Sequence, residues 1–237
     1  MVVTEDTRDE VIRLHDVIKV YREADVETIA LRGIDLVIRA GEFTAVMGRS
    51  GSGKTTLLNL IAGADRPTAG KVTVCGVSLD RADEAEREQL RGRSIGIVFQ
   101  TQNLVPFLTL TENVRLVGAL VQRDGSPENA AGLLDLVGLG DRGDHRPDQL
   151  SGGEQQRAAL ACVLVASPTV LLADEITGEL DSTTAAQVLE VVRAVHRERG
   201  VTVVMVTHDG GVASRADRVI RLANGQVVAD APLGIGA

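Results

Sequence analysis

Residues 48–55 read Gly-Arg-Ser-Gly-Ser-Gly-Lys-Thr and fit the pattern G-x-x-x-x-G-K-[ST] at every fixed position. A short apolar segment, residues 41–48, precedes this loop as a β-strand would, and residues 54–64 follow it with the pattern of a helix. A chance Gly/Ser turn is not expected to lie between a strand and a helix in this way. The loop therefore predicts an α/β fold with a binding site for a nucleoside triphosphate.

The composition of the loop suits phosphate binding. Gly51 and Gly53 let the backbone curl so that successive N–H groups point at phosphate oxygens, and the following helix adds the positive end of its dipole. Lys54 is placed to reach the β- and γ-phosphates, and the Thr55 hydroxyl is placed for Mg²⁺. The predicted nucleotide-binding residues of this segment are Gly48, Arg49, Ser50, Gly51, Ser52, Gly53, Lys54, Thr55 and Thr56.

Apolar strands alternate with helical patterns along the rest of the chain. Residues 94–99 predict a buried strand, and residues 169–174 and 201–206 are near-continuous apolar runs, as in strands that are buried on both faces. The segment between the last two runs predicts a helix that Asp181 or Ser182 caps and that Gly200 follows. This alternation favours a parallel sheet with helices on both faces.

Two other segments complete the expected architecture. Residues 11–40 alternate as half-buried strands, which indicates an antiparallel β edge. Residues 100–167 change to helical character interrupted by prolines. We therefore expect one domain over residues 11–231, with a helical insertion at about residues 101–167, after a disordered acidic leader at residues 1–10.

Charge and composition exclude several classes of protein. The net charge of −8 argues against broad electrostatic binding to nucleic acid. The N-terminal segment lacks the apolar core of a secretory signal, and no stretch reaches the roughly 18 consecutive apolar residues that a spanning helix needs. A membrane function would therefore need another chain to cross the bilayer. Cys75 and Cys162 have no metal-ligand spacing and are expected to be small buried hydrophobic residues.

An acidic pair follows the apolar run at residues 169–174. Asp174 ends this run and Glu175 comes next, beside the phosphate loop if the strands are parallel. Asp174 would then contribute to the Mg²⁺ shell, and Glu175 could polarise the attacking water as a general base. The alternative is that the pair merely ends a strand and opens a helix, where acidic residues are favoured.

Residues 150–157, Leu-Ser-Gly-Gly-Glu-Gln-Gln-Arg, lie between the phosphate loop and the acidic pair. With these motifs in this order, the chain resembles the ABC ATPase family over about residues 11–228. The resemblance implies a P-loop NTPase core with a parallel sheet, an antiparallel β subdomain and a helical insertion. In the family this signature segment closes on the γ-phosphate held by a second subunit. The residues matched to that trans contact are Ser151, Gly152, Gly153 and Glu154.

The resemblance assigns four further residues. Tyr21 matches the aromatic residue that stacks on adenine, although it could also simply pack on its sheet. Gln100 matches the glutamine that senses Mg²⁺ and the γ-phosphate, and the alternative is an ordinary amide at a strand end. His208 matches the switch histidine, and Asp181 matches the loop that crosses the dimer interface. The implied catalytic residues are Glu175, His208 and Gln100, and the implied Mg²⁺ ligands are Thr55, Gln100 and Asp174.

The resemblance also implies partners. ATP and Mg²⁺ are the implied cofactors, and the chain is expected to hydrolyse ATP as one half of a head-to-tail homodimer. A separate transmembrane permease is the implied partner, with no nucleic acid, which would place the chain peripherally at the cytoplasmic face of the cell membrane. Several segments look most like the lipoprotein-release and macrolide-export branch, so we expect export or extraction of a hydrophobic substrate. The alternative is an ATPase that regulates a non-transport membrane partner, such as a cell-division complex controlling wall hydrolases.

Residues 100–110, with the neighbouring helices up to about residue 150, are expected to receive the permease, because residues 105–108 form an apolar run that includes Phe107. The alternative is that Phe107 packs inside the helical insertion. The chain departs from the family pattern at Ile176 and Gly210, where relatives usually have proline. Both changes are expected to loosen the backbone without removing a catalytic side chain.

Overall fold

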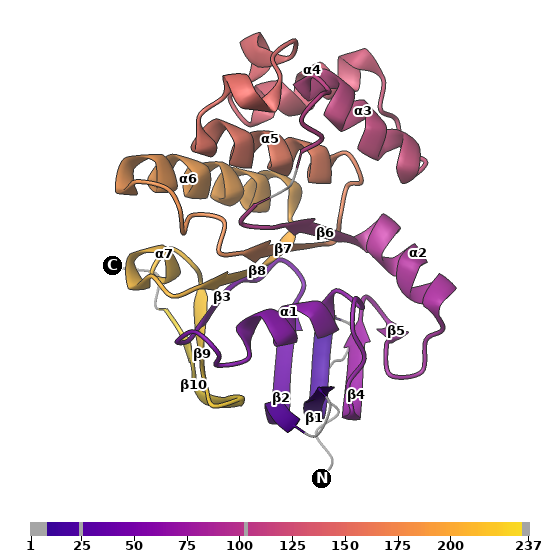
Figure 1. The fold of residues 1–237 in the computed structure, drawn as a ribbon, viewed down its shortest axis with the longest axis vertical. Coiled ribbons are helices and arrows are strands. Elements are labelled where there is room, and N and C mark those ends of the chain that lie inside the picture. Colours follow the sequence, from indigo (N-terminus) through magenta and orange to yellow (C-terminus); the bar gives the residue numbers. More distant parts are fainter. Residues whose placement is uncertain (1–8, 24–25, 102–103, 234–237) are drawn as a thin grey trace.

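The computed structural model describes residues 9–23, 26–101 and 104–233, and these residues form two β-sheets with helices between and above them (Figure 1). The larger sheet has the order β10-β9-β3-β8-β7-β6 and is parallel except for the antiparallel pair β10 and β9. Its strands are β3 (Phe43–Met47), β6 (Ile95–Val98), β7 (Val170–Asp174), β8 (Thr202–Thr207), β9 (Arg218–Ala223) and β10 (Gln226–Pro232).

The smaller sheet is antiparallel and has the order β2-β1-β4-β5. Its strands are β1 (Glu10–Glu23), β2 (Val26–Arg39), β4 (Ala69–Val74) and β5 (Val77–Ser78). The helices are α1 (Lys54–Ile61), α2 (Glu84–Ser94), α3 (Leu110–Leu120), α4 (Pro127–Leu136), α5 (Gly152–Leu164), α6 (Ser182–Arg199) and α7 (Gly210–Ala213), with 3₁₀ turns η2 (Gly140–Arg142) and η3 (Pro147–Gln149).

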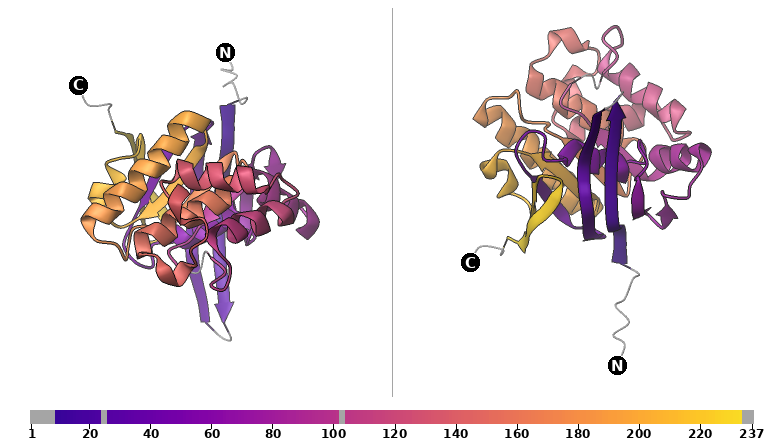
Figure 2. Two further views of the ribbon diagram at one scale, coloured as in Figure 1. Left: turned by 90° about the horizontal axis from the view of Figure 1, so that it is seen from above. Right: turned by 60° about the horizontal axis from the view of Figure 1, so that its bottom comes forward.

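The side chains of each central strand point alternately to two separate cores. On β7, Leu171 faces the helical layer of α3, α4, α5 and α6, while the next residue, Leu172, faces α1 and the antiparallel sheet. Helix α1 is therefore enclosed between the two sheets, and the helical insertion covers the opposite face of the parallel sheet (Figures 1 and 2). This layering confirms the predicted α/β architecture.

Some details differ from expectation. The sequence predicts a buried strand through Phe99, but β6 ends at Val98 and Phe99 is exposed. Pro127 and Pro147 do not interrupt helices; they begin α4 and η3, where a missing N–H costs nothing. Glu10, assigned to the disordered leader, belongs to β1, and residues 1–8 of that leader lie outside the described residues. The proposed limits of the domain and of the insertion stay predictions.

The two cysteines also differ from each other. Cys162 is buried in α5 as expected, and burial raises the pKa of its thiol to about 12. Cys75 is only half-buried, which corrects the expectation. It lies at the turn between β4 and β5 with a φ of 48°, beside Gly76, and a turn keeps its residues near the surface.

Arg218 of β9 joins the two sheets. Its guanidinium donates to both carboxylate oxygens of Asp230 on β10, at 2.6 and 2.5 Å, and to Glu42 at 3.0 Å. It also donates to the backbone oxygen of Val37 on β2 at 2.8 Å. Because this side chain is only 17% exposed, removal of its charge leaves two carboxylates with a lost partner in a partly dry environment.

We expect Arg218→Met to destabilise the protein by about 2 kcal/mol, which corresponds to a fall in Tm of roughly 4–8 °C in a chain of this size. The control is Arg215→Met, because Arg215 forms an exposed pair with Glu190. That variant should change the stability by less than about 0.5 kcal/mol. Equal Tm values for the two variants would contradict the role of Arg218.

Candidate functional site

Two glycines of the phosphate loop stand where no other residue fits. A Cβ on Gly53 would lie 2.7 Å from the backbone oxygen of Ala30 on β2, and Gly53 has a φ of 102°. A Cβ on Gly48 would lie 2.6 Å from the backbone oxygen of Leu222 on β9. The loop is therefore held between the antiparallel sheet and the edge of the parallel sheet, which fixes where its N–H groups point.

Backbone hydrogen bonds tighten this arrangement. Gly225, in the turn between β9 and β10, donates to the oxygen of Ser52 at 3.1 Å and accepts from the N–H of Arg32 on β2 at 2.8 Å. The same turn thus connects the loop to both sheets. The hydroxyl of Ser52 is buried and has no hydrogen-bond partner among the described residues, so it is free to bind an oxygen brought by a ligand.

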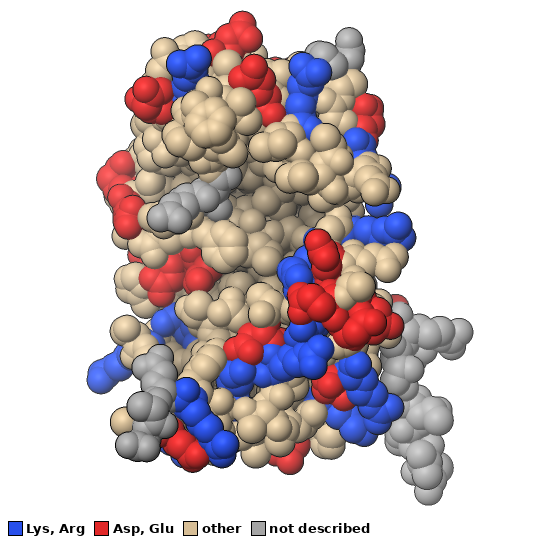
Figure 3. Space-filling model, turned by 45° about the vertical axis from the view of Figure 1, so that its right-hand side comes forward, with Lys and Arg blue, Asp and Glu red and all other residues tan. Residues whose placement is uncertain are grey.

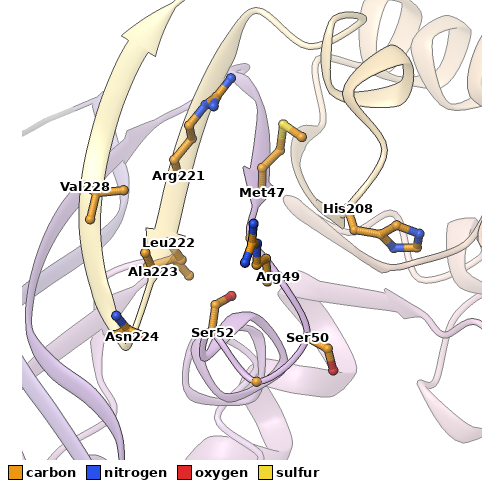
Figure 4. Close-up of a pocket in the computed structure, with 12 residues that line it drawn as sticks. Met47, Arg49, Ser50, Ser52, His208, Arg221, Leu222, Ala223, Asn224 and Val228 are labelled. Carbon is orange, nitrogen blue, oxygen red and sulfur yellow. The ribbon is translucent and has the colours of Figure 1, made fainter.

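A cavity of about 630 Å³ lies beside the loop. Arg49 and Ser50 of the loop line it together with Arg221 of β9 and His208, which lies across the cavity from β9 and β10 (Figure 4). The arginine at β9 was not anticipated from the sequence, because no local pattern brings β9 beside the loop. Both arginines give this side of the loop a positive character that suits an anion.

Lys54 and the acidic pair meet at the start of α1. The Nζ atom of Lys54 donates to the backbone oxygens of Gly48 and Arg49, at 2.9 and 3.2 Å, and lies 3.6 Å from Oε1 of Glu175. On the other side of Glu175, Nδ1 of His208 lies 3.2 Å from Oε2. The structure therefore brings together three residues that the sequence placed in one site: Lys54, Glu175 and His208.

Glu175 has a φ of 48°, in the left-handed region that favours glycine. Its N–H donates to Val206 at 3.1 Å and its oxygen accepts from Gly178 at 2.9 Å, so the strained backbone is held on both sides. Such strain costs roughly 1–3 kcal/mol and is concentrated at functional sites. Here it directs the carboxylate of Glu175 to the space between Lys54 and His208.

Asp174 ends β7 and is half-buried. Burial raises the pKa of its carboxyl group above the usual range, and the adjacent Glu175 raises it further, while Lys54 opposes both. A cation at this position would relieve the repulsion between the two carboxylates. The Thr55 hydroxyl, at the exposed start of α1, supplies a second oxygen of the kind that Mg²⁺ prefers. The donor set therefore suits Mg²⁺ bound with phosphate oxygens, and no group of three His, Cys, Asp or Glu in the described residues forms a metal site by itself.

The signature segment lies at the exposed N-terminus of α5. Ser151 caps this helix in a capping box: its hydroxyl oxygen accepts from the N–H of Glu154 at 3.4 Å, and its own N–H donates to Oε2 of Glu154 at 2.9 Å. The Ser151 hydroxyl also donates to that oxygen at 2.8 Å. These bonds hold the pKa of Glu154 below its usual range. A Cβ on Gly153 would collide with the side chain of Thr184, so α5 packs closely on α6 there. Ser151 and Gly152 remain exposed, which leaves the positive end of α5 open to an anion.

Gln100 makes hydrogen bonds to Glu179 and to α5. Its side-chain amide donates to Glu179 at 3.2 Å, and its backbone oxygen accepts from the buried Gln156 of α5 at 2.5 Å. Gln100 and Glu179 both line a groove of about 510 Å³ beside α5. In this conformation Gln100 therefore connects the signature helix to the segment after the acidic pair, a link that the sequence did not indicate.

The last two predicted residues lie on different elements. Asp181 caps α6, where its carboxylate accepts from the N–H groups of Thr183 and Thr184 at 3.0 and 3.1 Å, as predicted. Tyr21 lies on β1 and is 37% exposed, so it does not pack inside the sheet. Its hydroxyl donates to Asp65 at 2.9 Å.

The profile of the ABC transporter family matches residues 31–178, which span the phosphate loop, the signature segment and the acidic pair. The chain belongs to this family. As an ABC ATPase it binds and hydrolyses ATP, which confirms the activity expected from the motifs.

Named relatives of this ABC ATPase agree with the expected branch. It is 45% identical to the lipoprotein-releasing system ATP-binding protein LolD of Anaeromyxobacter dehalogenans, over 93% of this chain and 94% of that protein. It is 43% identical to the macrolide export ATP-binding/permease protein MacB of Syntrophobacter fumaroxidans, over 92% of this chain but only 31% of that longer protein. Both relatives confirm the resemblance to the lipoprotein-release and macrolide-export branch.

Solved structures confirm the fold of the ABC ATPase. A dimeric post-hydrolysis state of the ATP-binding cassette MJ0796, bound to ADP and Pi, superimposes with a TM-score of 0.85 at 38% identity and covers 94% of this chain and 98% of that one. Among the described residues, no helix is both long and apolar enough to cross a membrane.

The raised pKa of Asp174 gives a pH-dependent prediction. Because the folded state binds this proton more tightly than the unfolded state, the contribution of Asp174 to stability is greatest at acid pH and is lost as pH rises through its raised pKa. Ionised Asp174 therefore costs stability at neutral pH. We expect Asp174→Asn to raise the Tm of the nucleotide-free protein by about 1–3 °C at pH 7, and the gain to vanish near pH ~3, below the ordinary aspartate pKa.

The control for this experiment is Asp35→Asn. Hydrogen bonds from Asp16 and His15 hold the pKa of Asp35 below its usual range, so this change should lower the Tm or leave it unchanged. A fall in Tm at neutral pH for Asp174→Asn would show that the Asp174 carboxylate is satisfied rather than repelled.

Proposed function

We propose that this ABC ATPase energises a separate membrane permease of the lipoprotein-release or macrolide-export kind, for export or extraction of a hydrophobic substrate. The identity to LolD over nearly the whole of both chains supports this proposal. On this proposal the chain is peripheral to the membrane, at its cytoplasmic face, where ATP is available. The convergence of Lys54, Glu175 and His208 at the end of the phosphate loop is the observation on which the catalytic part rests.

In the proposed reaction the nucleotide phosphates replace the present contacts of Lys54. Its ammonium leaves the backbone oxygens of the loop and Glu175 and pairs with the β- and γ-phosphates instead. Glu175 is then free to accept the proton of the attacking water as general base, while His208 contacts the γ-phosphate. The hydroxyl of Ser52 and the N–H groups of residues 49–56 hold the remaining phosphate oxygens.

Thr55, Asp174 and Gln100 are the proposed ligands for Mg²⁺, which when bound neutralises charge on the phosphates. Thr55 and Asp174 already lie near the loop, but Gln100 must first release Glu179. A rotation of Gln100 would also change the shape of the groove beside α5, because Gln100 lines this groove and its backbone oxygen accepts a hydrogen bond from Gln156. We infer that nucleotide binding and groove shape are coupled through this residue.

The proposed assembly is a head-to-tail homodimer in which two ATP molecules lie between subunits. Ser151 and Gly152 lie exposed at the N-terminus of α5, which is suited to bind an anion. In the proposed dimer, this anion is the γ-phosphate of the ATP that a second copy holds. Asp181 lies at the start of α6, close to this surface through the Gly153–Thr184 contact. The dimeric MJ0796 cassette supports a paired arrangement.

The proposed permease contact lies on and around residues 100–110, of which residues 102–103 lie outside the described residues. Phe107 is 71% exposed, so the structure contradicts the alternative that it packs inside the insertion. Three more large apolar residues are exposed nearby in sequence: Phe99, Leu116 and Leu120. On the side that carries α2 and α3, the surface is hollowed and largely uncharged below the helical layer, with charged side chains gathered beneath (Figure 3). Large apolar residues that are exposed on one part of a surface are typical of an interaction site.

The catalytic proposal predicts that Glu175→Gln binds ATP with an affinity near that of the wild type but hydrolyses it at least about 100-fold more slowly, because its proton acceptor is lost. Lys54→Ala should instead weaken binding itself. Calorimetric affinity and single-turnover rates separate the two effects. Since hydrolysis no longer reopens the pair, Glu175→Gln should also become a dimer on addition of Mg·ATP, measured by size-exclusion chromatography with light scattering.

Ser151→Arg in the Glu175→Gln background is the control for dimer geometry. The added bulk at the N-terminus of α5 should prevent ATP-driven pairing and leave the affinity of each monomer for ATP unchanged. If the double variant still dimerises with ATP, the signature segment does not face the nucleotide of a second copy.

The permease proposal predicts that Phe107→Ala lowers both co-purification with the permease and the permease-stimulated part of ATP turnover by about 10-fold, since an apolar anchor is removed. Its ATP affinity and Tm should stay near wild type, because Phe107 is exposed. Leu233→Ala, at an exposed apolar residue that follows β10, is the matched control. A permease found with an associated wall hydrolase, and no transport activity, would favour the regulatory alternative.

A further inference from the structure

Tyr21 belongs to a compact group of three charged or polar side chains at the outer end of β1. Its hydroxyl donates to Oδ2 of Asp65 at 2.9 Å. The other oxygen of the same carboxylate, Oδ1, accepts from Nζ of Lys19 at 2.6 Å. Lys19 also lies over the ring of Tyr21, with Nζ 4.7 Å from the ring centroid. Asp65 therefore holds both the phenol and the cation that covers one face of its ring.

The position of Asp65 in the chain gives this contact a function. Asp65 follows α1, whose first turn is the end of the phosphate loop, and its N–H is bonded to the oxygen of Asn59 in that helix at 3.3 Å. Lys19 is further anchored by the backbone oxygen of Arg66 at 2.9 Å. The same short helix thus begins at the phosphate loop and leads into the turn that carries Asp65.

The two faces of the Tyr21 ring are not equivalent. Lys19 is bound on one face and is 12% exposed, so it is held in place rather than moving freely in solvent. Tyr21 as a whole still has 37% of its surface exposed, so a ligand can reach part of it. A cation against one face of an aromatic ring attracts its electrons and leaves the opposite face suited to stacking.

We propose that Asp65 is a positioning residue for the base: it fixes the plane of the Tyr21 ring, through the phenol and through Lys19, in the orientation that stacks on adenine. This inference rests on the proposed role of Tyr21 as the adenine contact. Asp65 itself does not touch the nucleotide. Its effect is to hold the ring before ATP arrives, so that less conformational freedom is lost on binding.

The test is a double-mutant cycle with two ligands, Mg·ATP and inorganic tripolyphosphate, in which the second ligand has no base. Asp65→Ala and Tyr21→Phe both remove the hydrogen bond, and Tyr21→Phe keeps the ring. Each should raise the Kd for ATP about 3- to 5-fold and leave the Kd for tripolyphosphate unchanged. Because both variants remove the bond between Tyr21 and Asp65, their effects on ATP binding should be less than additive in the double variant.

Steady-state kinetics give a second measurement. Asp65→Ala should raise KM for ATP by a similar factor and leave kcat near wild type, because the phosphate site is untouched. Asp35→Asn, which removes an exposed carboxylate on the neighbouring strand of the same sheet, is the control and should change neither value.

The chain has one tyrosine and no tryptophan, so the ultraviolet absorbance of its phenolate reports Tyr21 alone. Burial raises the pKa of Tyr21, the Thr56 hydroxyl lowers it, and the bond to Asp65 raises it. Asp65→Ala should therefore shift the titration of the phenol to lower pH. In the wild type, ATP should change the tyrosine fluorescence, while tripolyphosphate should not.

The outcomes are distinct. If Tyr21→Ala leaves ATP affinity unchanged, Tyr21 is not the adenine contact and the proposed site is wrong, and the inference falls with it. If Tyr21→Ala weakens ATP binding about 5- to 30-fold but Asp65→Ala has no effect, only the positioning role is overturned. A loss of tripolyphosphate binding in Asp65→Ala, or additive effects of Asp65→Ala and Tyr21→Phe, would also overturn it. An unchanged phenol titration would show that the hydrogen bond is not formed in solution.

Discussion

The close approach of the phosphate loop to the backbones of both sheets underlies the whole site. Gly53 lies against Ala30 of β2, Gly48 lies against Leu222 of β9, and the turn at Gly225 is bonded to the loop and to β2. Any side chain at either loop glycine would push one of the sheets away. The antiparallel sheet is therefore part of the proposed nucleotide site, and Arg218, which joins it to β9 and β10, supports that site from a distance.

The charges of Lys54, Asp174 and Glu175 at the phosphate loop can be balanced in two ways. In this structure the ammonium of Lys54 is neutralised by Glu175 and by oxygens of its own loop. The cost of this state is carried by Asp174, which keeps its proton more firmly beside Glu175. In the proposed bound state, the phosphates would pair with Lys54 and Asp174 would bind Mg²⁺. Binding of phosphates and Mg²⁺ would therefore remove the unfavourable interaction between the Asp174 and Glu175 carboxylates. Functional sites commonly give up some folding stability in this way.

The motif-bearing half of the fold was predictable because its signals are local. The loop, the helix cap at Asp181 and the apolar run of β7 each depend on neighbours in sequence. The missing parts are contacts between distant segments. The bonds from Gln100 to Glu179 and from Tyr21 to Asp65 join residues that are far apart in the sequence, and no repeating sequence pattern predicts them. The exposure of Phe99 and Cys75 was misjudged because hydrophobic character alone does not say where a strand ends.

Helix α1 has eight residues, and at 1.5 Å per residue it spans about 12 Å between the phosphate loop and the turn that carries Asp65. Because α1 is enclosed between two sheets, its length fixes the distance between the phosphate loop and Asp65. One inserted residue would rotate everything beyond it by about 100° and withdraw the carboxylate from β1. Loops on a protein surface tolerate changes in length, whereas a change in the length of α1 would separate the phosphate loop from its contact with β1.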